Sequence, residues 1–334
     1  MAEILPTHTP ALFATAVERA ADLLRAGEVV ALPTETVYGL AANALDRNAV
    51  AKIFQIKGRP ANNPIIVHVA SVAMAKRCVN NWPGGAAGLA RAFWPGPLTL
   101  VLPRAPEIPD NVTAGGATVG VRWPGHPFIQ AVIRACDFPL AAPSANLSNR
   151  VSPTTAGHVQ KQLGGKIPLI VDGGQSQIGI ESTVLDLSVR PPQVLRPGMI
   201  HVESLAAVVG NIEQRTANIE RRTLRSPGLL KTHYAPKAKL VVLNWRDEAD
   251  LQRQLCHSPF VIRHCHIIAH THIPPVENFA DVSVIPRDAE AFARAIYAEL
   301  HRCDEAGAEL IVVEAPPGLP EWSGIADRLK RAAA

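Results

Sequence analysis

Aromatic residues are scarce in this chain, and the common nucleotide-binding and hydrolase motifs are missing from it. Phe, Trp and Tyr make up 5% of the 334 residues. Proteins that recognise single-stranded RNA stack its bases on aromatic side chains, so this composition disfavours that class. The sequence contains no GxxxxGKS/T phosphate loop, no strand-associated GxGxxG, no GxSxG elbow and no kinase motif set. A nucleotide that binds this protein is therefore expected to be held in another way.

Long apolar runs, a signal peptide and paired cysteines are also lacking. No apolar run reaches the roughly 18 residues that a membrane-spanning helix needs, and residues 1–20 lack a cationic segment followed by an apolar one. The five cysteines are scattered and include no CxxC pair, which is typical of reduced thiols in a cytosol. We therefore expect a cytoplasmic protein that does not associate with membranes.

The net charge of +4 is unevenly distributed along the chain. Lys and Arg outnumber Asp and Glu by 17 to 13 in residues 1–208 and by 6 to 2 in residues 209–238, whereas residues 239–334 carry 10 against 14. The two positive parts would attract a polyanionic substrate. Ordinary solvated surface explains the same counts, so charge alone does not decide between the two interpretations.

Segments with strand-like and helix-like patterns alternate in the first part of the chain. Strands are predicted at residues 29–32, 64–69, 98–102, 117–122, 138–142, 168–172 and 182–187, and helices at residues 47–57 and 71–79. This interleaving is typical of the α/β class. Several links between strands are too short for a crossover helix, which favours a mixed sheet over a purely parallel one.

A polar connector rich in turn residues separates this part from a second α/β segment. Residues 209–238 include Ser-Pro-Gly and Tyr-Ala-Pro and are predicted to form a linker. The patterns in residues 239–334 have the spacing of a small doubly wound domain. The predicted organisation is a first domain at 1–208, a linker that crosses its site at 209–238, and a smaller domain at 239–334.

Clusters of polar residues follow several of the predicted strands. Thr34, Glu35 and Thr36 come directly after the apolar run 28–33, where hydrogen-bonding side chains would line the mouth of a site. Lys57 and Arg59 follow a predicted helix, and together they could grip a polyphosphate. A positively charged helix C-terminus, which the helix dipole favours, is the simpler explanation of that pair taken alone.

Two further loops carry groups suited to anion binding. Arg122 ends a predicted strand, where a clamp for a carboxylate or phosphate would belong. The loop at residues 142–154 offers Ser144 and Asn146, whose side chains and backbone N–H groups could form an anion-binding nest. Ser152, which precedes a proline, is instead predicted to cap the next helix.

Five histidines lie close together in HSPFVIRHCHIIAHTH, residues 257–272. His264 and His266, like His270 and His272, have strand-like spacing and could bind zinc. No carboxylate partner or regular zinc spacing accompanies them. A surface segment is therefore favoured, and no metal site is predicted.

Taken together, these segments resemble the Sua5/YrdC family. TETVYGL, KGR and PSAN correspond to the family's threonine-rich strand end and its KxR and SxN signature, and TVGVR, ESTV, LRPG and SPG…HYAPK follow in the expected order. The motifs cover roughly residues 20–240, and the remainder resembles the two-domain Sua5 type in its layout. The resemblance implies a twisted open mixed sheet around a concave, positive cleft, with a smaller Rossmann-like domain beyond it.

The resemblance also implies a reaction and the residues that serve it. Members of the family form L-threonylcarbamoyl-AMP and pyrophosphate from L-threonine, bicarbonate and ATP, with Mg2+. A transferase complex then uses the product for the t6A modification of tRNA. By motif, the L-threonine positions are Thr36, His68, Arg122, Ala142 (through its backbone) and Ser182. The ATP positions are Lys57, Arg59, Asn63, Thr118, Ser144, Ser152, Arg196 and Tyr234, and the catalytic positions are Lys57, Arg59, Ser144 and Asn146.

The implied chemistry requires neither a covalent enzyme intermediate nor a metal site made by the protein alone. Lys57, Arg59 and Arg196 with Mg2+ would stabilise the leaving pyrophosphate, so catalysis rests on positioning and charge neutralisation. His233 and Tyr234 in the linker are expected to close over the occupied cleft, because a free carbamate is labile in water. Binding to tRNA is expected to be weak at most.

Two other functions remain as alternatives. An RNA-binding module would use the basic cleft and linker, but the few aromatic residues and the missing RRM and KH signatures argue against it. A carbamoyltransferase on the same fold would usually carry further catalytic domains upstream, whereas this chain starts almost directly at the domain. The expected activity is therefore that of a nucleotidyltransferase.

Overall fold

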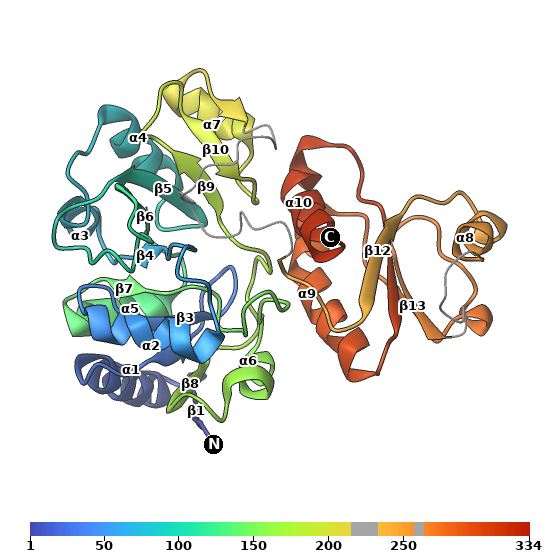
Figure 1. Cartoon of the computed structure of the whole chain (residues 1–334), viewed down its shortest axis with the longest axis horizontal. Coiled ribbons are helices and arrows are strands. Elements are labelled where there is room, and N and C mark those ends of the chain that lie inside the picture. Colours follow the sequence, from blue (N-terminus) through green and yellow to red (C-terminus); the bar gives the residue numbers. More distant parts are fainter. Residues whose placement is uncertain (215–232, 257–263) are drawn as a thin grey trace. The chain divides into compact units, whose positions relative to one another are not determined.

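The computed structural model describes residues 1–214, 233–256 and 264–334, which fall into two compact units (Figure 1). The first unit comprises Met1–Ser148 and Ser152–Leu229, and the second comprises Asn149–Val151 and Leu230–Ala334. No helix within the described ranges is long and apolar enough to cross a membrane.

The first unit is built on a mixed sheet of 11 strands. The strands are β1 (Glu3–Pro6), β2 (Val30–Leu32), β3 (Gly39–Asn43), β4 (Val67–His68), β5 (Leu98–Pro103), β6 (Thr118–Arg122), β7 (Leu140–Ala141), β8 (Leu169–Asp172), β9 (Thr183–Asp186), β10 (Gln193–Arg196) and β11 (Glu213–Gln214). Their order across the sheet is β1-β8-β2-β3-β7-β4-β6-β5-β9-β10-β11. Parallel and antiparallel pairs both occur, which confirms the predicted α/β class with a mixed sheet.

Seven helices accompany this sheet in the described part of the first unit. They are α1 (Pro10–Arg25), α2 (Arg47–Lys57), α3 (Val72–Arg77), α4 (Gly84–Phe93), α5 (Pro127–Cys136), α6 (Ala156–Leu163) and α7 (Val202–Val209).

Local sequence sets the ends of α2. Asp46 caps its start by accepting hydrogen bonds from two backbone N–H groups. Gly58 ends it in a left-handed conformation (φ 60°), which glycine adopts without strain.

The apolar residues of the inner strands and of the flanking helices form one core. Leu32, Leu40 and Val67 are completely buried in it. Helix α1 packs against α5, where the rings of Phe13 and Phe128 meet edge to face with 5.1 Å between their centroids. Burial of this apolar surface is the main force that holds the strand ends in place, because each square ångström contributes about 25 cal/mol.

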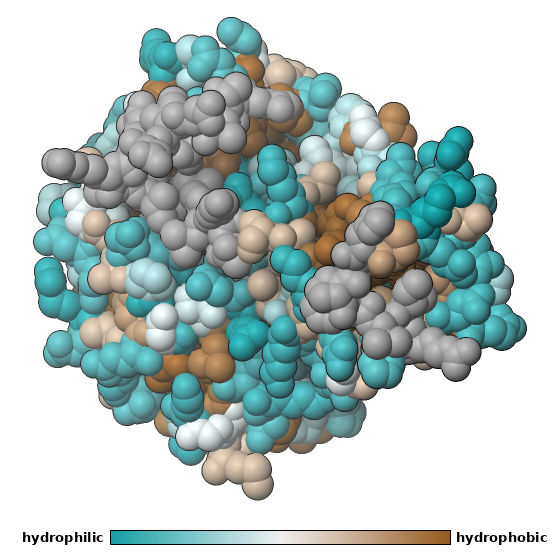
Figure 2. Space-filling view, turned by 45° about the vertical axis from the view of Figure 1, so that its right-hand side comes forward, coloured by the Kyte–Doolittle hydropathy of each residue, from teal (hydrophilic) through white to brown (hydrophobic). Residues whose placement is uncertain are grey.

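Large apolar side chains are rarely exposed in the described parts of the chain. The exposed ones are Met1, Ile4, Leu45, Val208, Ile273, Val276, Val284 and Leu319. The face in Figure 2 is accordingly dominated by hydrophilic residues, with smaller separate apolar areas. Scattered exposed apolar residues are normal for a folded protein and mark no site by themselves.

The second unit has a parallel sheet in the order β12-β15-β13-β14. Its elements are β12 (Lys239–Leu243), α8 (Glu248–Leu255), β13 (Cys265–Ala269), the 3-10 turn η2 (Val276–Asn278), β14 (Asp281–Val284), α9 (Ala289–Glu305), β15 (Leu310–Glu314), the 3-10 turn η3 (Pro320–Trp322) and α10 (Ser323–Ala332). Figure 1 shows α8 on one side of this sheet and α9 with α10 on the other. This is the small Rossmann-like domain that the strand and helix spacing predicted.

Alternating side chains of the inner strands cover the two faces of this small sheet. Ile267 of β13 and Val312 of β15 pack with Leu251 of α8 in one apolar cluster. Their neighbours Ile268 and Val313 are buried as well and point to the opposite face, because successive side chains of a strand alternate. Near-continuous apolar strands of this kind are typical of a parallel sheet covered by helices on both faces.

Glu314, the last residue of β15, organises the loop that follows β13. Its carboxylate accepts hydrogen bonds from the backbone N–H groups of His270 (2.7 Å), Thr271 (2.8 Å) and His272 (3.2 Å). Burial opposes ionisation, but these backbone hydrogen bonds outweigh it and hold the pKa of Glu314 below its usual value. A buried carboxylate of the chain itself therefore fills the nest of N–H groups at this end of the sheet.

The prediction that the histidine-rich segment lies on the surface is wrong for two of its members. His266 is 6% exposed, and the side chain of His270 is 4% exposed and packs edge to face against Phe292. The reason is that the segment supplies β13, an inner strand of the sheet. Its carboxylate partner, Glu314, lies far away in the sequence. The described residues contain no group of three or more side chains able to hold a metal ion, and residues 257–263 lie outside them.

We predict that Glu314→Ala lowers the free energy of unfolding of the second unit by about 1–3 kcal/mol, because three backbone N–H groups in a part-buried loop lose a charged acceptor. Since the folded-state pKa of Glu314 is lowered, its stabilisation is complete above the usual carboxylate pKa and is lost as the pH falls through the folded-state value. Denaturant unfolding at several pH values measures both effects. Glu277→Ala, which removes an exposed carboxylate, is the control, and equal losses in both variants would contradict the prediction.

Candidate active site

Several polar loops lie near the central strands β7 and β4 of the large sheet. The central strands β7 and β4 have two residues each, which is about 7 Å of strand. The loops after β2 and β7 leave one end of the sheet, and those after β4 and β6 leave the other, so only this short span separates them. The first two loops are also joined directly, since Ala145 N donates to Tyr38 O (2.7 Å), and Leu40 N of the adjoining β3 donates to Pro143 O (2.8 Å).

The loop after β2 is shaped by its own threonines. The Thr34 hydroxyl accepts hydrogen bonds from the backbone N–H groups of Thr36 (3.2 Å) and Val37 (3.3 Å), and its oxygen lies 2.9 Å from the Thr36 hydroxyl oxygen. All three residues are buried. A hydroxyl that bonds the backbone two and three residues ahead holds a turn without any secondary structure. The turn fixes the position of the Thr36 hydroxyl.

Arg122 is held from three directions at the end of β6. Its Nη2 lies 2.7 Å from Oε1 of Glu35, Nη1 donates to the Thr36 hydroxyl at 3.0 Å, and Nε donates to Gly96 O at 3.2 Å. The backbone N–H of Gly125 donates to the same Glu35 oxygen at 2.7 Å. Because Arg122 and Glu35 are both nearly fully buried, the pair requires this close partnering to offset the loss of hydration.

The charges in this part of the site are set by burial and by Arg122. Burial would raise the pKa of Glu35, but the charge of Arg122 and the Gly125 N–H outweigh it, so this pKa is lowered. Burial and the Arg122 charge together lower the pKa of His68 to about 3. His68 pairs with Arg122 in the register of β4 and β6, and its Nδ1 has no hydrogen-bond partner among the described residues. At neutral pH the site therefore holds one ion pair beside a neutral imidazole.

The ammonium group of Lys57 holds the loop after β7. Its Nζ donates to Ser144 O at 2.6 Å and to both the backbone oxygen and Oδ1 of Asn146. Three acceptors match the three donors of an ammonium group. Burial, reinforced by the charge of Arg59, lowers the pKa of Lys57. The predicted KxR and SxN signature residues are thus in direct contact, and Lys57 fixes the position of the SxN loop.

Arg59 organises the turn that follows α2. Its guanidinium donates to Asn63 O (3.0 Å), Asn63 Oδ1 (2.7 Å) and Pro64 O (2.6 Å). Asn63 is completely buried, and its Nδ2 has no hydrogen-bond partner within the described residues. A buried amide N–H without a protein acceptor is a group that a ligand oxygen would satisfy.

Ser182 and Arg196 form a third group at the start of β9. The Ser182 hydroxyl lies 2.8 Å from that of Thr99, and Arg196 donates to Ser182 O from Nε (3.1 Å) and Nη2 (3.0 Å). Close packing is enforced beside them, because a Cβ on Gly198 would come within 2.6 Å of Thr183 N. The arginine is therefore tied to the strand that carries the serine.

The prediction that Ser152 caps the next helix is wrong. Helix α6 begins at Ala156 and is capped by Thr155, whose side chain accepts a hydrogen bond from His158 N. Ser152 instead donates to Oε1 of Glu181 at 2.6 Å, and both residues are buried. The segment before the helix is instead bonded to the loop after β2, since Pro153 O accepts a hydrogen bond from Tyr38 N at 2.9 Å.

The remaining predicted site residues with described positions are Ala142, Thr118 and Tyr234. The N–H of Ala142 donates to Ile66 O at 3.2 Å in the middle of the sheet. Thr118 begins β6, and Arg122 ends it, about 13 Å away along the strand. Tyr234 belongs to the second unit, where its ring stacks on Tyr297 at 5.9 Å. Most of the predicted lid at 209–238 lies outside the described residues.

Two acidic residues of the site were not assigned from the sequence. Glu35 stands between two of the threonines, and Glu181 directly precedes Ser182. Each contacts a residue that the motifs did single out, namely Arg122 and Ser152. The available signal was a carboxylate inside a run of otherwise uncharged residues at a strand end.

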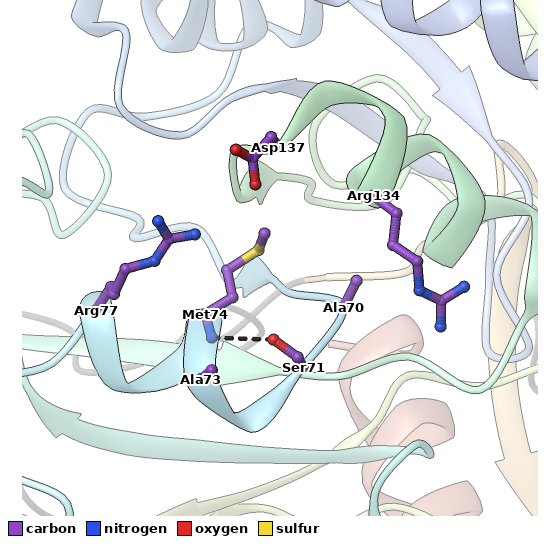
Figure 3. A pocket seen from close by; sticks show the side chains of 7 residues that line it. All are labelled: Ala70, Ser71, Ala73, Met74, Arg77, Arg134 and Asp137. Carbon is purple, nitrogen blue, oxygen red and sulfur yellow. Dashed lines mark hydrogen bonds between the residues drawn. The ribbon is translucent and has the colours of Figure 1, made fainter.

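The first unit also has an open hollow of about 570 Å³ beside α3 and α5 (Figure 3). It is lined by Ala70, Ser71, Ala73, Met74, Arg77, Arg134 and Asp137. Its serine is occupied in capping α3, where it accepts a hydrogen bond from Met74 N at 3.1 Å. None of the predicted site residues lines this hollow, and the candidate active site is the buried polar cluster.

A mixed-sheet α/β unit with buried cations and hydroxyls near its strand ends, followed by a Rossmann-like unit, defines a class of two-domain α/β proteins. The family model described as "Telomere recombination" (Sua5, YciO and YrdC) matches residues 22–198, and that described as "Threonylcarbamoyl-AMP synthase, C-terminal domain" matches residues 200–334. The chain belongs to the Sua5/YrdC family.

Relatives at the level of whole proteins agree with this membership. The threonylcarbamoyl-AMP synthase of Bacillus subtilis is 41% identical over 95% of this chain and 92% of its own length. That of Pyrococcus abyssi is 48% identical over 67% of this chain and 66% of its own length. The crystal structure of P. abyssi Sua5 complexed with L-threonine aligns with a TM-score of 0.89 and 36% identity, covering 100% of this chain and 97% of that one. The first unit also resembles the fold of Escherichia coli YciO (TM-score 0.54, 24% identity).

We predict that Lys57→Ala destabilises the first unit as well as removing a charge from the site. The change removes the three hydrogen bonds that Lys57 donates to Ser144 and Asn146, at a cost of about 1–3 kcal/mol in the free energy of unfolding. Lys52→Ala, on the same helix, removes an exposed ion pair with Glu28 and should have little effect. Denaturant unfolding of the two variants tests this, and an unchanged stability of Lys57→Ala would disprove the anchoring role.

Proposed function

We propose that this chain forms L-threonylcarbamoyl-AMP and pyrophosphate from L-threonine, bicarbonate and ATP. The observation that carries the proposal is the buried group of Arg122, Thr36 and His68. It offers a cation for a carboxylate, a hydroxyl for a hydroxyl and a neutral imidazole beside them. That chemistry suits L-threonine, and the family relatives of this chain are named as synthases of this product.

In the proposed complex, the threonine carboxylate binds Arg122, and the Thr36 hydroxyl and Ser182 face the polar atoms of the substrate. The backbone at Ala142 forms the adjoining wall. A site built to pair a substrate hydroxyl rejects analogues that lack it, because its own buried groups would then be left unpaired. Selectivity for threonine over apolar amino acids of similar size follows from this arrangement.

ATP is proposed to bind through the remaining groups of the cluster. Arg59 and Arg196 face the phosphates, with Asn63, Ser144 and Ser152 as hydrogen-bonding partners. Thr118 and Tyr234 are further proposed contacts from the family motifs. The cations would stabilise the negative charge that develops on the leaving pyrophosphate. Lys57 contributes its charge and keeps the loop of Ser144 and Asn146 in place.

Mg2+ is proposed to arrive with the phosphates of ATP. Both acidic residues of the cluster are already engaged, Glu35 by Arg122 and Glu181 by Ser152. Magnesium commonly keeps most of its ligands from water and substrate phosphates, with one or two from the protein. The residues present therefore fit a metal held mainly by the substrate, and the metal would neutralise phosphate charge.

The reaction follows from bond changes at the substrates. The ammonium group of bound threonine first releases a proton, and the resulting neutral amine attacks the carbon of bicarbonate, which forms the N–C bond of a carbamate and releases water. A carbamate oxygen then attacks the α-phosphate of ATP, and the bond to the β-phosphate breaks to release pyrophosphate. The protein contributes position and charge neutralisation, and burial of the site protects the carbamate from water.

The proposal extends to the setting of the enzyme. The first domain at 1–208 would be catalytic, the linker at 209–238 would close over the occupied site, and residues 239–334 would form the second domain. The product would pass in the cytoplasm to a transferase complex that makes t6A in tRNA, and this chain itself would bind tRNA weakly. An RNA-binding module or a carbamoyltransferase with another acceptor is the alternative if the assays below fail.

Release of pyrophosphate from ATP is the test of the proposed function. We expect release that requires both L-threonine and bicarbonate and that is slower with L-serine, which lacks the methyl group. Mass spectrometry of the reaction mixture should show threonylcarbamoyl-AMP. Release that is indifferent to threonine would leave the family membership intact and disprove the proposed acceptor.

Arg122→Ala should raise the KM for L-threonine by about 10- to 100-fold, because one charge-assisted contact is lost. The KM for ATP should change much less. Arg19→Ala, which removes an exposed arginine paired with Glu3, serves as the control for loss of positive charge. Equal rises in both KM values for Arg122→Ala would show that the arginine does not belong to the threonine half of the site.

A further inference from the structure

The buried carboxylate of Glu35 has no part in the reaction described above, although it lies at its centre. Glu35 is 6% exposed. One of its oxygens, Oε1, contacts Arg122 Nη2 and accepts the Gly125 N–H, both at 2.7 Å. The other, Oε2, is buried without a hydrogen-bond partner in the described parts of the chain. A buried charge is costly, so its retention beside a substrate-binding arginine requires an explanation.

The groups around Glu35 leave it as the one counter-charge to Arg122 in the described cluster. The ionisable side chains that its charge reaches are Arg122, His68 and His126. Burial lowers the pKa of both histidines, so both are neutral at neutral pH. The lowered pKa of Glu35 keeps its carboxylate ionised in the same range. One positive and one negative charge remain, and together they cancel.

Arg122 retains donors for a ligand in spite of this pairing. An arginine has five N–H groups. Within the described residues, two of them donate to the Thr36 hydroxyl and to Gly96 O, and Nη2 forms the ion pair with Glu35 but has no hydrogen-bond partner. The remaining N–H groups are on the two terminal nitrogens, from which an arginine can donate to both oxygens of a carboxylate. Glu35 therefore holds the guanidinium in position without using all of its donors.

We infer that Glu35 makes the amino-acid site selective for a zwitterion. The ion pair gives the empty site no net charge, so a ligand with a carboxylate and an ammonium group enters without adding any. A carboxylate ligand that lacks the ammonium group would place a net negative charge close to Glu35 in a buried site. In a buried site, an uncompensated like charge within about 4–6 Å weakens the binding of a charged ligand by roughly tenfold or more. The inference rests on the proposed function, since it assumes that Arg122 receives an amino acid.

Binding calorimetry with two ligands of the same carbon skeleton tests this. L-threonine is compared with (R)-3-hydroxybutanoate, in which hydrogen replaces the ammonium group. We expect the unaltered protein to bind threonine at least about tenfold more tightly than the analogue. Glu35→Gln, which keeps the shape and removes the charge, should reduce this preference by about tenfold, because Arg122 then attracts an anion without compensation.

Two further variants separate charge from shape. Glu35→Asp retains the carboxylate and should keep the preference for threonine, even if both affinities fall. Glu28→Gln removes a carboxylate from the same segment, at the exposed ion pair with Lys52, and should leave both affinities unchanged. If Glu35→Gln weakened both ligands by the same factor, Glu35 would have only a structural role, and the inference would be wrong.

Measurements on the unaltered protein remain decisive if a variant does not fold. L-threoninamide carries the ammonium group without a carboxylate charge. If Glu35 balances the charge of Arg122, the protein should bind threonine more tightly than either L-threoninamide or 3-hydroxybutanoate. Tight binding of the anionic analogue alone would overturn the inference while leaving threonine as the substrate. No binding of threonine at all would overturn the proposed function and the inference with it.

Discussion

The centre of the large sheet is held by β7 and β4, and each of these strands has two residues. A strand pair of this length brings loops from opposite ends of a sheet within reach of one another. Arg122, at the end of β6, can therefore bond Thr36, which follows β2 at the other end. Longer central strands would separate the two and leave each side chain in its own loop. The site exists because the sheet is narrow at this point.

A second constraint comes from the burial of four cations in this narrow region. Lys57, Arg59, Arg122 and Arg196 are each less than 10% exposed, and the cost of removing such charges from water must be offset locally. Three of them are held chiefly by backbone or amide oxygens, and Arg122 has a carboxylate partner. The neutral acceptors leave a net positive region for a polyphosphate, whereas the paired arginine leaves a region without net charge. In the proposed complex, ATP would face the net positive region and L-threonine the region without net charge.

In the described part of the second unit, the carboxyl ends of the sheet strands offer no free group of backbone N–H donors after β13. In doubly wound sheets, ligands commonly bind at the carboxyl ends of the strands. Here Glu314 fills the nest of backbone N–H groups after β13 with its own carboxylate. An anion from solution would have to displace it. This arrangement favours a structural role for that loop.

Much of the architecture was open to prediction because it depends on local patterns. Helix α2 has the predicted bounds, since Asp46 and Gly58 are strong start and stop signals. The α/β class and the small parallel sheet followed from strand and helix spacing, and the family motifs identified most of the side chains in the buried cluster. Two local predictions were wrong for a tertiary reason. Ser152 bonds Glu181 instead of capping a helix, and His266 and its neighbours lie in an inner strand.

The sequence by itself therefore determined the class of the fold, the succession of its elements and the chemical identity of the groups available for catalysis. Only the tertiary structure decided which of those groups are partners. Glu35 meets Arg122, and Lys57 meets Asn146, across separations of 87 and 89 residues. Such pairings depend on the order of the strands across the sheet and on the length of the central ones. Local patterns of polarity do not encode that order, because each strand is specified by its own alternation and not by its neighbour.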